Sequence, residues 1–453
     1  MKNKWITIRR ARIAAAFLVA AVMAAAFSGT AAWTARAARL EFVPALLRSI
    51  AAFSAGALAT VLILIALTWL FGRFYCACLC PLGIWQDLWG FVSRRAGRRA
   101  KNLPVLRYLV GGIVFGALAG GWALGFALLD PYSNFGRGVA GRAALGGLIP
   151  LAVTALLAVW KKRIFCTAVC PAGTLLGLFG RFGLFKIRFT DKCVKCGLCV
   201  KSCPAGCVDL AAGSIDNERC VRCMNCLAVC KVAGVEFTAR RGTAKTAETK
   251  AFDRSRREFL VRGGVLLAGL AAGFAVARSG VVKTAALALA GAKKLILPPG
   301  AGDLERFAAK CTACQLCTAN CPAKIIVPAP GGDGAVRINL SRGACRYDCS
   351  KCGSVCPTGA IKKLTLKEKR RTKIAEAAFD PKLCLACHGD DPCGRCADAC
   401  PAGAIRPVGP RRVPRLKKTL CIGCGACQAA CPAAPKAMTV HAIEKQCLTE
   451  NGS

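Results

Sequence analysis

Residues 193–230 read CVKCGLCVKSCPAGCVDLAAGSIDNERCVRCMNCLAVC, and this stretch decides the fold of the segment around it. It contains the pattern Cys-x2-Cys-x2-Cys-x3-Cys twice. Three cysteines spaced i, i+3, i+6 can wrap one iron–sulfur cubane, while the fourth reaches the neighbouring cubane. We therefore predict two [4Fe–4S] clusters with exchanged fourth ligands, one on Cys193, Cys196, Cys199 and Cys230, the other on Cys220, Cys223, Cys226 and Cys203.

Zinc and disulfide bonds are the two alternatives for these cysteines. Zinc sites use four ligands, commonly as two separated cysteine pairs. Eight cysteines in two continuous runs favour iron–sulfur clusters instead. The second run departs from the usual pattern in one place, because Lys231 stands where Pro204 follows the first run.

A second cysteine array follows within residues 311–431, in four groups that each end in Cys-Pro. The groups are Cys311, Cys314, Cys317 and Cys321; Cys345, Cys349, Cys352 and Cys356; Cys384, Cys387, Cys393, Cys396 and Cys400; and Cys421, Cys424, Cys427 and Cys431. They predict four more [4Fe–4S] clusters, hence six in total. Two points stay open: whether Cys384 or Cys387 is the ligand, and whether the groups exchange fourth cysteines sequentially or as one with four and two with three.

The segment Cys384-x2-Cys387-His388 also matches the attachment pattern of c-type haem. The group that follows it, Cys393 to Cys400, needs one more cysteine from upstream to complete a cluster. We therefore favour the cluster over the haem.

The composition indicates a membrane protein with cysteine-rich parts outside the bilayer. The 453 residues include 32 cysteines, and the mean hydropathy is +0.45. The apolar residues form blocks within 11–160 and 261–297, whereas most cysteines lie elsewhere. The formal charge of +42 is partly offset by clusters of about −2 each, and no nucleic-acid motif accompanies the basic residues.

Four transmembrane helices are expected in the first block, at residues 13–33, 50–72, 105–129 and 143–160. Basic residues concentrate in segments 73–104 and 161–163, which the positive-inside rule assigns to the cytoplasm. The first ferredoxin run is then cytoplasmic. The only histidines, His388 and His441, lie near the C-terminus, which excludes a histidine-ligated haem in the bilayer.

The first block contains an internal repeat with an offset of 90 residues. Arg73-Phe-Tyr-Cys76-x3-Cys80-Pro-x-Gly returns as Arg163-Ile-Phe-Cys166-x3-Cys170-Pro-x-Gly. A repeat of this kind predicts a duplicated helical hairpin that brings its four cysteines together. We interpret them as a redox junction, acting as a metal site or as redox thiols; simple packing of small thiols is the alternative.

Acidic residues are scarce in the same block. Residues 1–190 contain only Glu41, Asp87 and Asp130. A quinol site there would have to find its proton acceptor among these residues, or use thiols, tyrosines or the backbone.

A twin-arginine export signal is expected inside the chain. Residues 255–260 read SRREFL and precede an apolar, Gly- and Ala-rich stretch at 261–277. This pattern predicts a fifth transmembrane helix that carries residues 298–453 across the membrane. Because this route exports folded proteins, clusters can be loaded before export.

These features together resemble two known families. The first half is similar to the NapH/MauN-type membrane ferredoxins, whose membrane module is shared with NosR. The second half is similar to the NapG/MauM-type exported four-cluster ferredoxins, here fused to the first. The resemblance implies electron transfer from the quinol pool, through the bacterial inner membrane, towards a periplasmic reductase or cytochrome.

The expected fold is therefore membrane α-helical, with small α+β ferredoxin-like domains. We expect a four-helix module at 1–180, a cytoplasmic two-cluster domain at 181–235, a linker at 236–254, the twin-arginine helix at 255–297 and a periplasmic four-cluster domain at 298–453. Two other functions remain open. One is a maturation factor that supplies electrons for a partner's cofactor, and the other is a redox sensor that switches through the repeated cysteines.

Overall fold

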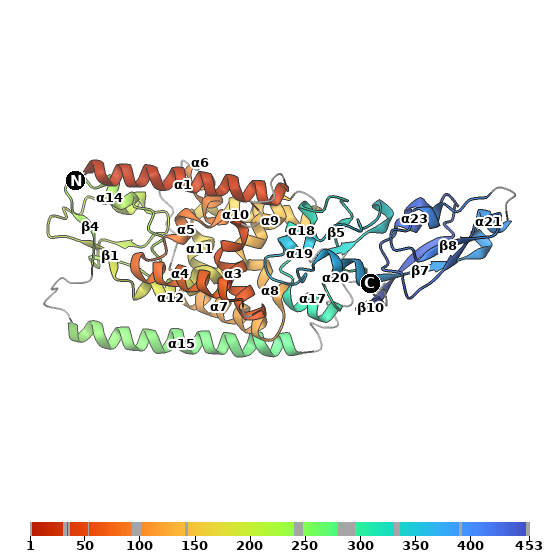
Figure 1. Cartoon of the computed structure of the whole chain (residues 1–453). Coiled ribbons are helices and arrows are strands. Elements are labelled where there is room, and N and C mark those ends of the chain that lie inside the picture. Colours follow the sequence, from red (N-terminus) through yellow and green to blue (C-terminus); the bar gives the residue numbers. More distant parts are fainter. Residues whose placement is uncertain are drawn as a thin grey trace.

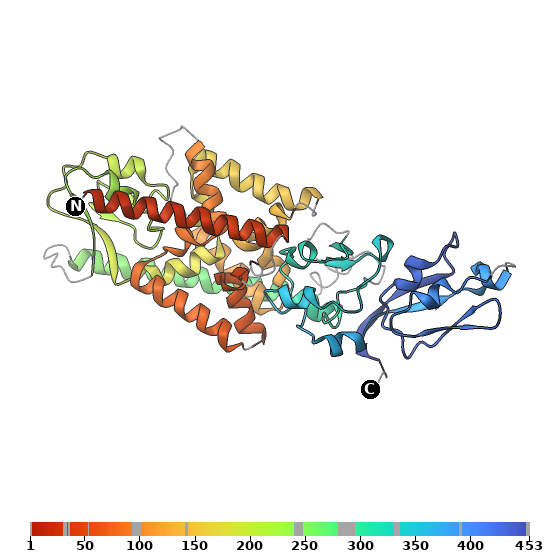
Figure 2. The same cartoon turned by 45° about the horizontal axis from the view of Figure 1, so that its top comes forward.

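The computed structural model describes residues 2–29, 34, 37–52, 54–92, 102–140, 144–239, 248–279, 295–329, 336–388 and 392–449. The molecule is elongated (Figures 1 and 2). A helical part lies between two parts with short strands, which form the two ends of the molecule (Figure 1). We call residues 185–239 the first ferredoxin part and residues 295–449 the second ferredoxin part.

The helical part consists of α1 and the helices up to residue 181, with α15 alongside (Figure 1). Its main helices are α1 (Lys2–Ser28), α3 (Phe42–Ala52), α4 (Ala55–Phe71), α6 (Pro81–Val92), α7 (Pro104–Ala119), α8 (Ala123–Leu129), α9 (Pro131–Val139), α10 (Ala144–Lys161), α12 (Pro171–Arg181) and α15 (Glu248–Arg278). Shorter turns are η1 (Ala38–Leu40), α5 (Tyr75–Cys78) and α11 (Ile164–Ala168).

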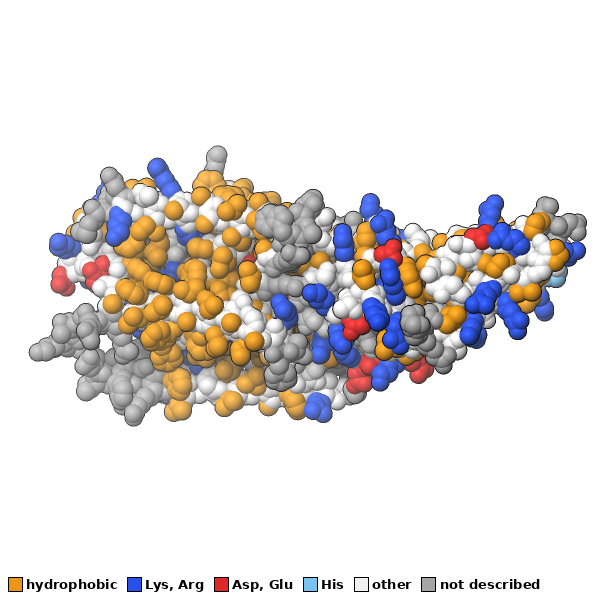
Figure 3. Space-filling model, in the orientation of Figure 1, with side chains coloured by type: hydrophobic (Ala, Val, Ile, Leu, Met, Phe, Trp, Pro, Cys, Tyr) orange, Lys and Arg blue, Asp and Glu red, His pale blue; other side chains and the backbone are white. Residues whose placement is uncertain are grey.

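Two helices of the described chain are long and apolar enough to cross a bilayer. They are Lys4–Ser28, with 25 residues, and Arg257–Arg278, with 22. The apolar helices Ala55–Phe71, Pro104–Ala119 and Gly147–Lys161 are shorter. Hydrophobic side chains cover the visible face of the helical part, whereas Lys and Arg side chains are distributed over the surface of the second ferredoxin part (Figure 3).

The helix boundaries differ from the expected spans for local reasons. α1 ends at Ser28 because Gly29 takes a positive φ of 75°, so the helix stops short of residue 33. The third expected span is divided into α7 and α8, because Gly120 caps α7 and Gly121 has a φ of 92°. Residue 50 belongs to α3, and α4 begins only at Ala55.

α15 packs against α7 along glycines on both helices. A Cβ at Gly112 would lie 2.5 Å from the Leu266 carbonyl oxygen, and one at Gly269 would lie 2.7 Å from that of Leu109. Similar overlaps recur one turn further on, at Gly116 and Gly273. Residues later in α7 contact residues later in α15, so the two helices run parallel. Their backbones approach each other closely at these glycines, as in small-xxx-small helix pairs.

The first ferredoxin part is built on two-stranded antiparallel sheets. β1 (Phe185–Phe189) pairs with β4 (Val235–Ala239), and β2 (Val208–Asp209) pairs with β3 (Ser214–Ile215). The helices α13 (Leu198–Ser202) and α14 (Asn225–Val229) each begin one residue before the third cysteine of a run. These elements are short because the cysteine loops, rather than a large apolar core, organise the segment.

Glu218 of the first ferredoxin part joins it to the helical part. Its carboxylate lies 2.9 Å from Arg107 Nη1 on α7 and 3.3 Å from Arg262 Nη1 on α15. The Tyr108 hydroxyl donates a third bond of 2.5 Å. Because Glu218 is only 7% exposed, this network fixes both helices to the loop that precedes Cys220.

The second ferredoxin part contains three two-stranded antiparallel sheets, formed by β5 (Ile326–Pro328) with β6 (Val336–Ile338), β7 (Thr372–Phe379) with β10 (Met438–Leu448), and β8 (Ile405–Val408) with β9 (Val413–Leu416). Its helices are α17 (Leu304–Lys310), α18 (Leu316–Ala319), η2 (Leu340–Arg342), α19 (Lys351–Val355), α20 (Leu366–Arg371), η3 (Pro381–Leu383), α21 (Leu385–His388), α22 (Arg395–Asp398) and α23 (Ala426–Ala430).

This part adjoins the end of α1. Asn320 Nδ2 donates to the Ala26 carbonyl at 3.3 Å. The predicted linker and leader are described only in part, since residues 240–247 and 280–294, with the side chain of Arg256, lie outside the described residues.

Candidate functional site

The regular cysteine loops share one local backbone conformation. In each Cys-x2-Cys-x2-Cys loop, the residue before the second cysteine and the residue after it both have positive φ. These residues are Lys195 and Gly197, Arg222 and Met224, Ala313 and Gln315, and Gly423 and Gly425. Successive turns of this kind direct backbone N–H groups toward the space between the cysteines, which suits an anionic group.

The first ferredoxin part brings the predicted fourth cysteines to the exchanged positions. Cys203 lies among Cys220, Cys223 and Cys226, close enough to interact electrostatically with them. At the other set, the Gly234 backbone N–H donates to Cys230 Sγ at 3.2 Å, and Gly234 packs directly against Cys193.

The second ferredoxin part contains four small cavities, each lined by four cysteines. The sets are Cys311, Cys314, Cys317 and Cys356; Cys345, Cys349, Cys352 and Cys321; Cys421, Cys424, Cys427 and Cys400; and Cys384, Cys393, Cys396 and Cys431. Fourth cysteines are thus exchanged between neighbouring groups, first with second and third with fourth. Cys384 lines the last cavity, and Cys387 lies beside it in α21.

These cysteine sets fit [4Fe–4S] clusters rather than single metal ions. Among the described residues, no three His, Cys, Asp or Glu side chains converge as they would on one ion. A cubane needs its four thiolates spread around a small cavity lined by apolar side chains and backbone, which is what these sets provide. When bound, such clusters supply one-electron transfer.

Burial disfavours free thiolates at these sites. It raises the pKa of Cys223 and of Cys314 to about 12, so these thiols stay protonated until a metal displaces the proton. Cys220 differs, because a hydrogen bond from the Cys207 thiol lowers its pKa to about 6. The Cys207 sulfur also lies 3.6 Å from Cys203 Sγ.

Cys207 is a functional candidate that the spacing analysis did not identify. It belongs to neither run, and its partners come from both of them. Hydrogen bonds to cluster sulfurs raise reduction potentials, so Cys207 can tune the set that contains Cys203 and Cys220.

The repeated cysteines of the helical part form a buried cluster related by a pseudo-two-fold axis. Arg73 Nη2 donates to the Cys166 carbonyl at 2.9 Å, and Arg163 Nη1 donates to the Cys76 carbonyl at 2.6 Å. Each arginine therefore crosses to the other repeat. The four thiols of Cys76, Cys80, Cys166 and Cys170 interact electrostatically with one another and are at most 4% exposed.

Glycines make these crossings possible. A Cβ at Gly83 would overlap the Cys76 carbonyl, and one at Gly173 would overlap both the Cys166 carbonyl and Arg73. The two glycines are 90 positions apart, like the arginines.

The three acidic residues within residues 1–181 have different environments. Asp87 pairs with Arg163 through two bonds of 2.6 Å, and the Asp130 carboxylate caps α9. Glu41 is 5% exposed and accepts a hydrogen bond from the Tyr75 hydroxyl. Cys80 lies near enough to Glu41 for the two to interact electrostatically.

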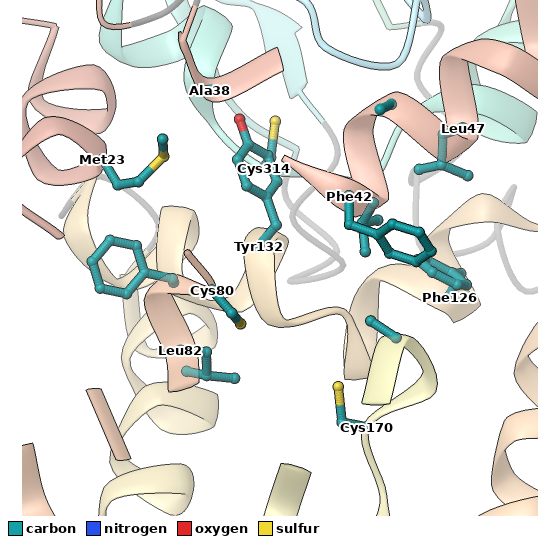
Figure 4. Close-up of a cluster of buried hydrophobic side chains, with 14 of the residues drawn as sticks. Met23, Ala38, Phe42, Leu47, Cys80, Leu82, Phe126, Tyr132, Cys170 and Cys314 are labelled. Carbon is teal, nitrogen blue, oxygen red and sulfur yellow. The ribbon is translucent and has the colours of Figure 1, made fainter. Parts of the chain in front are cut away.

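A tyrosine of α9 interacts electrostatically with Glu41 of the helical part and with Cys314 of the second ferredoxin part. Figure 4 shows Tyr132 above Cys80 and Cys170, with its hydroxyl beside Cys314. Tyr132 is 1% exposed, and its hydroxyl has no hydrogen-bond partner among the described residues. A Cβ at Gly136, one turn along α9, would lie 2.7 Å from the Cys314 carbonyl oxygen.

Family models match most of these segments. Residues 53–99 and 143–190, which hold the two repeats, match a model described as a 4Fe-4S binding domain. Models described as 4Fe-4S dicluster domains match residues 185–236, 216–325, 310–361 and 391–435.

Named relatives agree with these models. The chain is 33% identical over 139 residues to the methylamine utilization ferredoxin-type protein MauN of Paracoccus denitrificans, covering 29% of this chain and 48% of that protein. It is 28% identical over 142 residues to the ferredoxin-type protein NapH of Escherichia coli, covering 29% and 47%. It is 35% identical over 140 residues to the ferredoxin-type protein NapF of Escherichia coli, covering 30% and 80%.

The chain thus spans about half the length of MauN and NapH. No solved structure matches it. With four-cysteine sets in both ferredoxin parts and a relative covered over most of its length, the chain belongs to the ferredoxin-type proteins that bind [4Fe–4S] clusters.

Proposed function

We propose that this protein is a membrane-spanning electron conduit, which passes electrons from quinol to a redox partner beyond its second ferredoxin part. Six [4Fe–4S] clusters, held by the sets of four cysteines described above, serve as its carriers. Cys384, rather than Cys387, completes the last set. The first ferredoxin part lies in the cytoplasm, and the second lies in the periplasm next to an acceptor reductase or cytochrome.

The placement of the two ferredoxin parts at opposite ends of α1 supports this proposal most directly. Trp5, near the start of α1, contacts Phe237 of the first ferredoxin part with 6.4 Å between ring centroids. Ala26, near its end, accepts the hydrogen bond from Asn320 of the second. Trp5 and Ala26 are 21 positions apart, which corresponds to about 32 Å at 1.5 Å per residue, close to the thickness of a bilayer core of about 30 Å.

The parallel packing of α15 on α7 supports the same topology. α7 meets the Glu218 network of the first ferredoxin part near its start, through Arg107, and α15 meets it near its middle, through Arg262. From there α15 leads toward the second ferredoxin part (Figure 1). In this arrangement the twin-arginine helix remains in the membrane as part of the helical bundle. Its glycine contacts with α7 anchor the exported part to the module that supplies its electrons.

Glu41 is the best candidate for the proton acceptor of quinol oxidation. The other two carboxylates within residues 1–181 bind Arg163 and the start of α9, whereas Glu41 is bonded to Tyr75 beside Cys80. A quinol that loses two electrons also releases two protons. A buried carboxylate next to the four-cysteine cluster can receive one of them and pass it outward.

Quinol-driven reduction of the purified protein tests this function. Adding a quinol anaerobically should produce the EPR signals of reduced [4Fe–4S] clusters, and a Glu41→Gln variant should slow their appearance. Glu236→Gln on the exposed face of β4 is the matched control and should leave the rate unchanged. If quinol reduces no cluster that dithionite reduces, the proposed electron donor is wrong.

A further inference from the structure

The four-cysteine cluster of the helical part has an electrostatic environment that free thiols do not require. Arg73 and Arg163 are both fully buried beside it. Asp87 lies 2.6 Å from Arg163 and 3.4 Å from the partly exposed Arg12, and among the described residues no carboxylate pairs with Arg73. The charge of Arg73 is therefore buried without a carboxylate to compensate it, which is unfavourable in a low-dielectric interior.

We propose that Cys76, Cys80, Cys166 and Cys170 together hold a seventh iron–sulfur cluster. Its role as a relay between the two ferredoxin parts rests on the proposed function, whereas its binding does not. The four thiols would lose their protons on binding iron and sulfide. A four-thiolate [4Fe–4S] cluster carries about −2, and this negative charge would compensate Arg73.

Arg73 shows most clearly that an anion is required. Its guanidinium bonds only to the carbonyls of Glu218 and Cys166 and, at 3.7 Å, to Cys76 Sγ, while its Nε has no partner among the described residues. In the other repeat, Asp87 neutralises Arg163, but the position 90 residues after Asp87 is Gly177. The nearest groups that can compensate Arg73 are therefore the cysteine sulfurs.

Further donors point at the same sulfurs. Gln86 Nε2 donates to Cys166 Sγ at 3.1 Å, and the Gly173 backbone N–H donates to Cys170 Sγ at 3.3 Å. Cys80 and Cys170 each precede a helix that starts with proline, α6 and α12. Each helix N-terminus contributes roughly half a positive charge, which stabilises thiolates beside it.

The cluster also lies between the two ferredoxin parts. The Arg163 backbone N–H donates to the carbonyl of Pro204, which follows Cys203, and the Arg163 side chain reaches the Cys76 carbonyl. On the opposite side, Cys80 interacts electrostatically with Glu41, and Tyr132 interacts with both Glu41 and Cys314 (Figure 4). The four-cysteine cluster therefore contacts the first ferredoxin part through Arg163 and is linked to the second through Glu41 and Tyr132.

A redox centre at this place divides the distance that electrons must travel. Electron tunnelling slows exponentially with distance, so a single step along the whole span of α1 would be too slow for a useful carrier. Two shorter steps, each moving one electron with no bond formed or broken, remove that problem. A disulfide would exchange two electrons and two protons per turnover, and it would leave Arg73 without a counter-charge.

Iron content of the full-length protein tests the site independently of electron transfer. Six [4Fe–4S] clusters bring about 24 irons, and a seventh iron–sulfur cluster adds two or four. A Cys80→Ser, Cys170→Ser double variant should lose those two or four irons and the matching sulfide. The control is Cys78→Ser, which removes a half-buried cysteine of the same segment and should keep the wild-type content.

Three results would overturn the inference: equal iron in the double variant and the control, wild-type iron of about 24 or fewer, or a disulfide within the cluster. The third result needs no variant, because anaerobic unfolding in iodoacetamide leaves disulfide-bonded cysteines unalkylated, and mass spectrometry identifies them. If iron falls as expected but quinol still reduces no cluster, the site stands and the proposed function fails.

Discussion

Replacing Gly269 with leucine should separate α15 from α7. The Cβ of the new residue would lie 2.7 Å from the Leu109 carbonyl oxygen, against 3.4 Å for an ordinary contact, so the helices must part by about 0.7 Å for this atom alone. The Gly112 Cα lies 3.1 Å from the same position, and three more side-chain carbons need room there. Overpacking of this kind costs about 1–3 kcal/mol.

Thermal unfolding of the purified full-length protein measures this cost. Each kcal/mol lowers Tm by about 2–4 °C for a part of 150–250 residues, so Gly269→Leu should lower it by several degrees. Gly264→Leu is the matched control, because it lies on the same helix and its Cβ meets nothing within 4 Å. Both changes raise helix propensity equally. Equal melting temperatures for the two variants would refute the packing of α15 on α7.

Three further predictions concern single sites. Cys384→Ser should remove one cluster signal from the EPR spectrum of the reduced protein, whereas Cys387→Ser should keep it; the opposite outcome would exchange the two roles. Cys207→Ala should lower the midpoint potential of one cluster in a redox titration, since a hydrogen bond to two ligand sulfurs is lost; unchanged potentials in the whole titration would contradict that role. A reporter that works only in the periplasm should be active when fused after Ser453 and inactive when Arg256 and Arg257 are both changed to lysine, while activity in both proteins would exclude export by the twin-arginine route.

The spacing of the cysteines predicts the three-cysteine loops because each loop is local. Three ligands fall within seven residues, and the backbone turns between them recur wherever the spacing recurs. The exchange of fourth cysteines in the second ferredoxin part was not predictable in this way. The exchange depends on which groups lie side by side in space. For the third and fourth groups, this follows from the pairing of β7 with β10, which encloses both groups and joins residues more than 50 positions apart.

The repeated motif predicted a set of four cysteines, and the structure brings their thiols together. What surrounds them was less accessible from sequence. Arg73 and Arg163 stood inside the repeat, but only their crossing to the opposite carbonyls shows that two positive charges are buried at the cluster. The ion pairs of Glu218 could not be predicted from the sequence. Its partners lie in α7 and α15, and no regular spacing in the sequence connects these helices with Glu218.

The helix ends were predicted least accurately. Hydropathy alone extends each span until a charge interrupts it, whereas Gly29 and Gly121 end or divide helices through positive φ within apolar sequence. Residues 105–129 are rich in Gly and Ala, a composition that favours close helix packing. It could not identify α15 as the partner, since the matching glycines lie more than 140 residues away.

Passage of electrons from one ferredoxin part to the other through the four-cysteine cluster can be tested in sealed vesicles. The vesicles contain the protein in their membrane and enclose ferricyanide, and dithionite is added only outside. Ferricyanide should lose its absorbance in vesicles with the wild-type protein, and much more slowly with the Cys80→Ala, Cys170→Ala double variant. Ferricyanide that stays oxidised with the wild-type protein, or is reduced equally fast with the variant, would contradict the account.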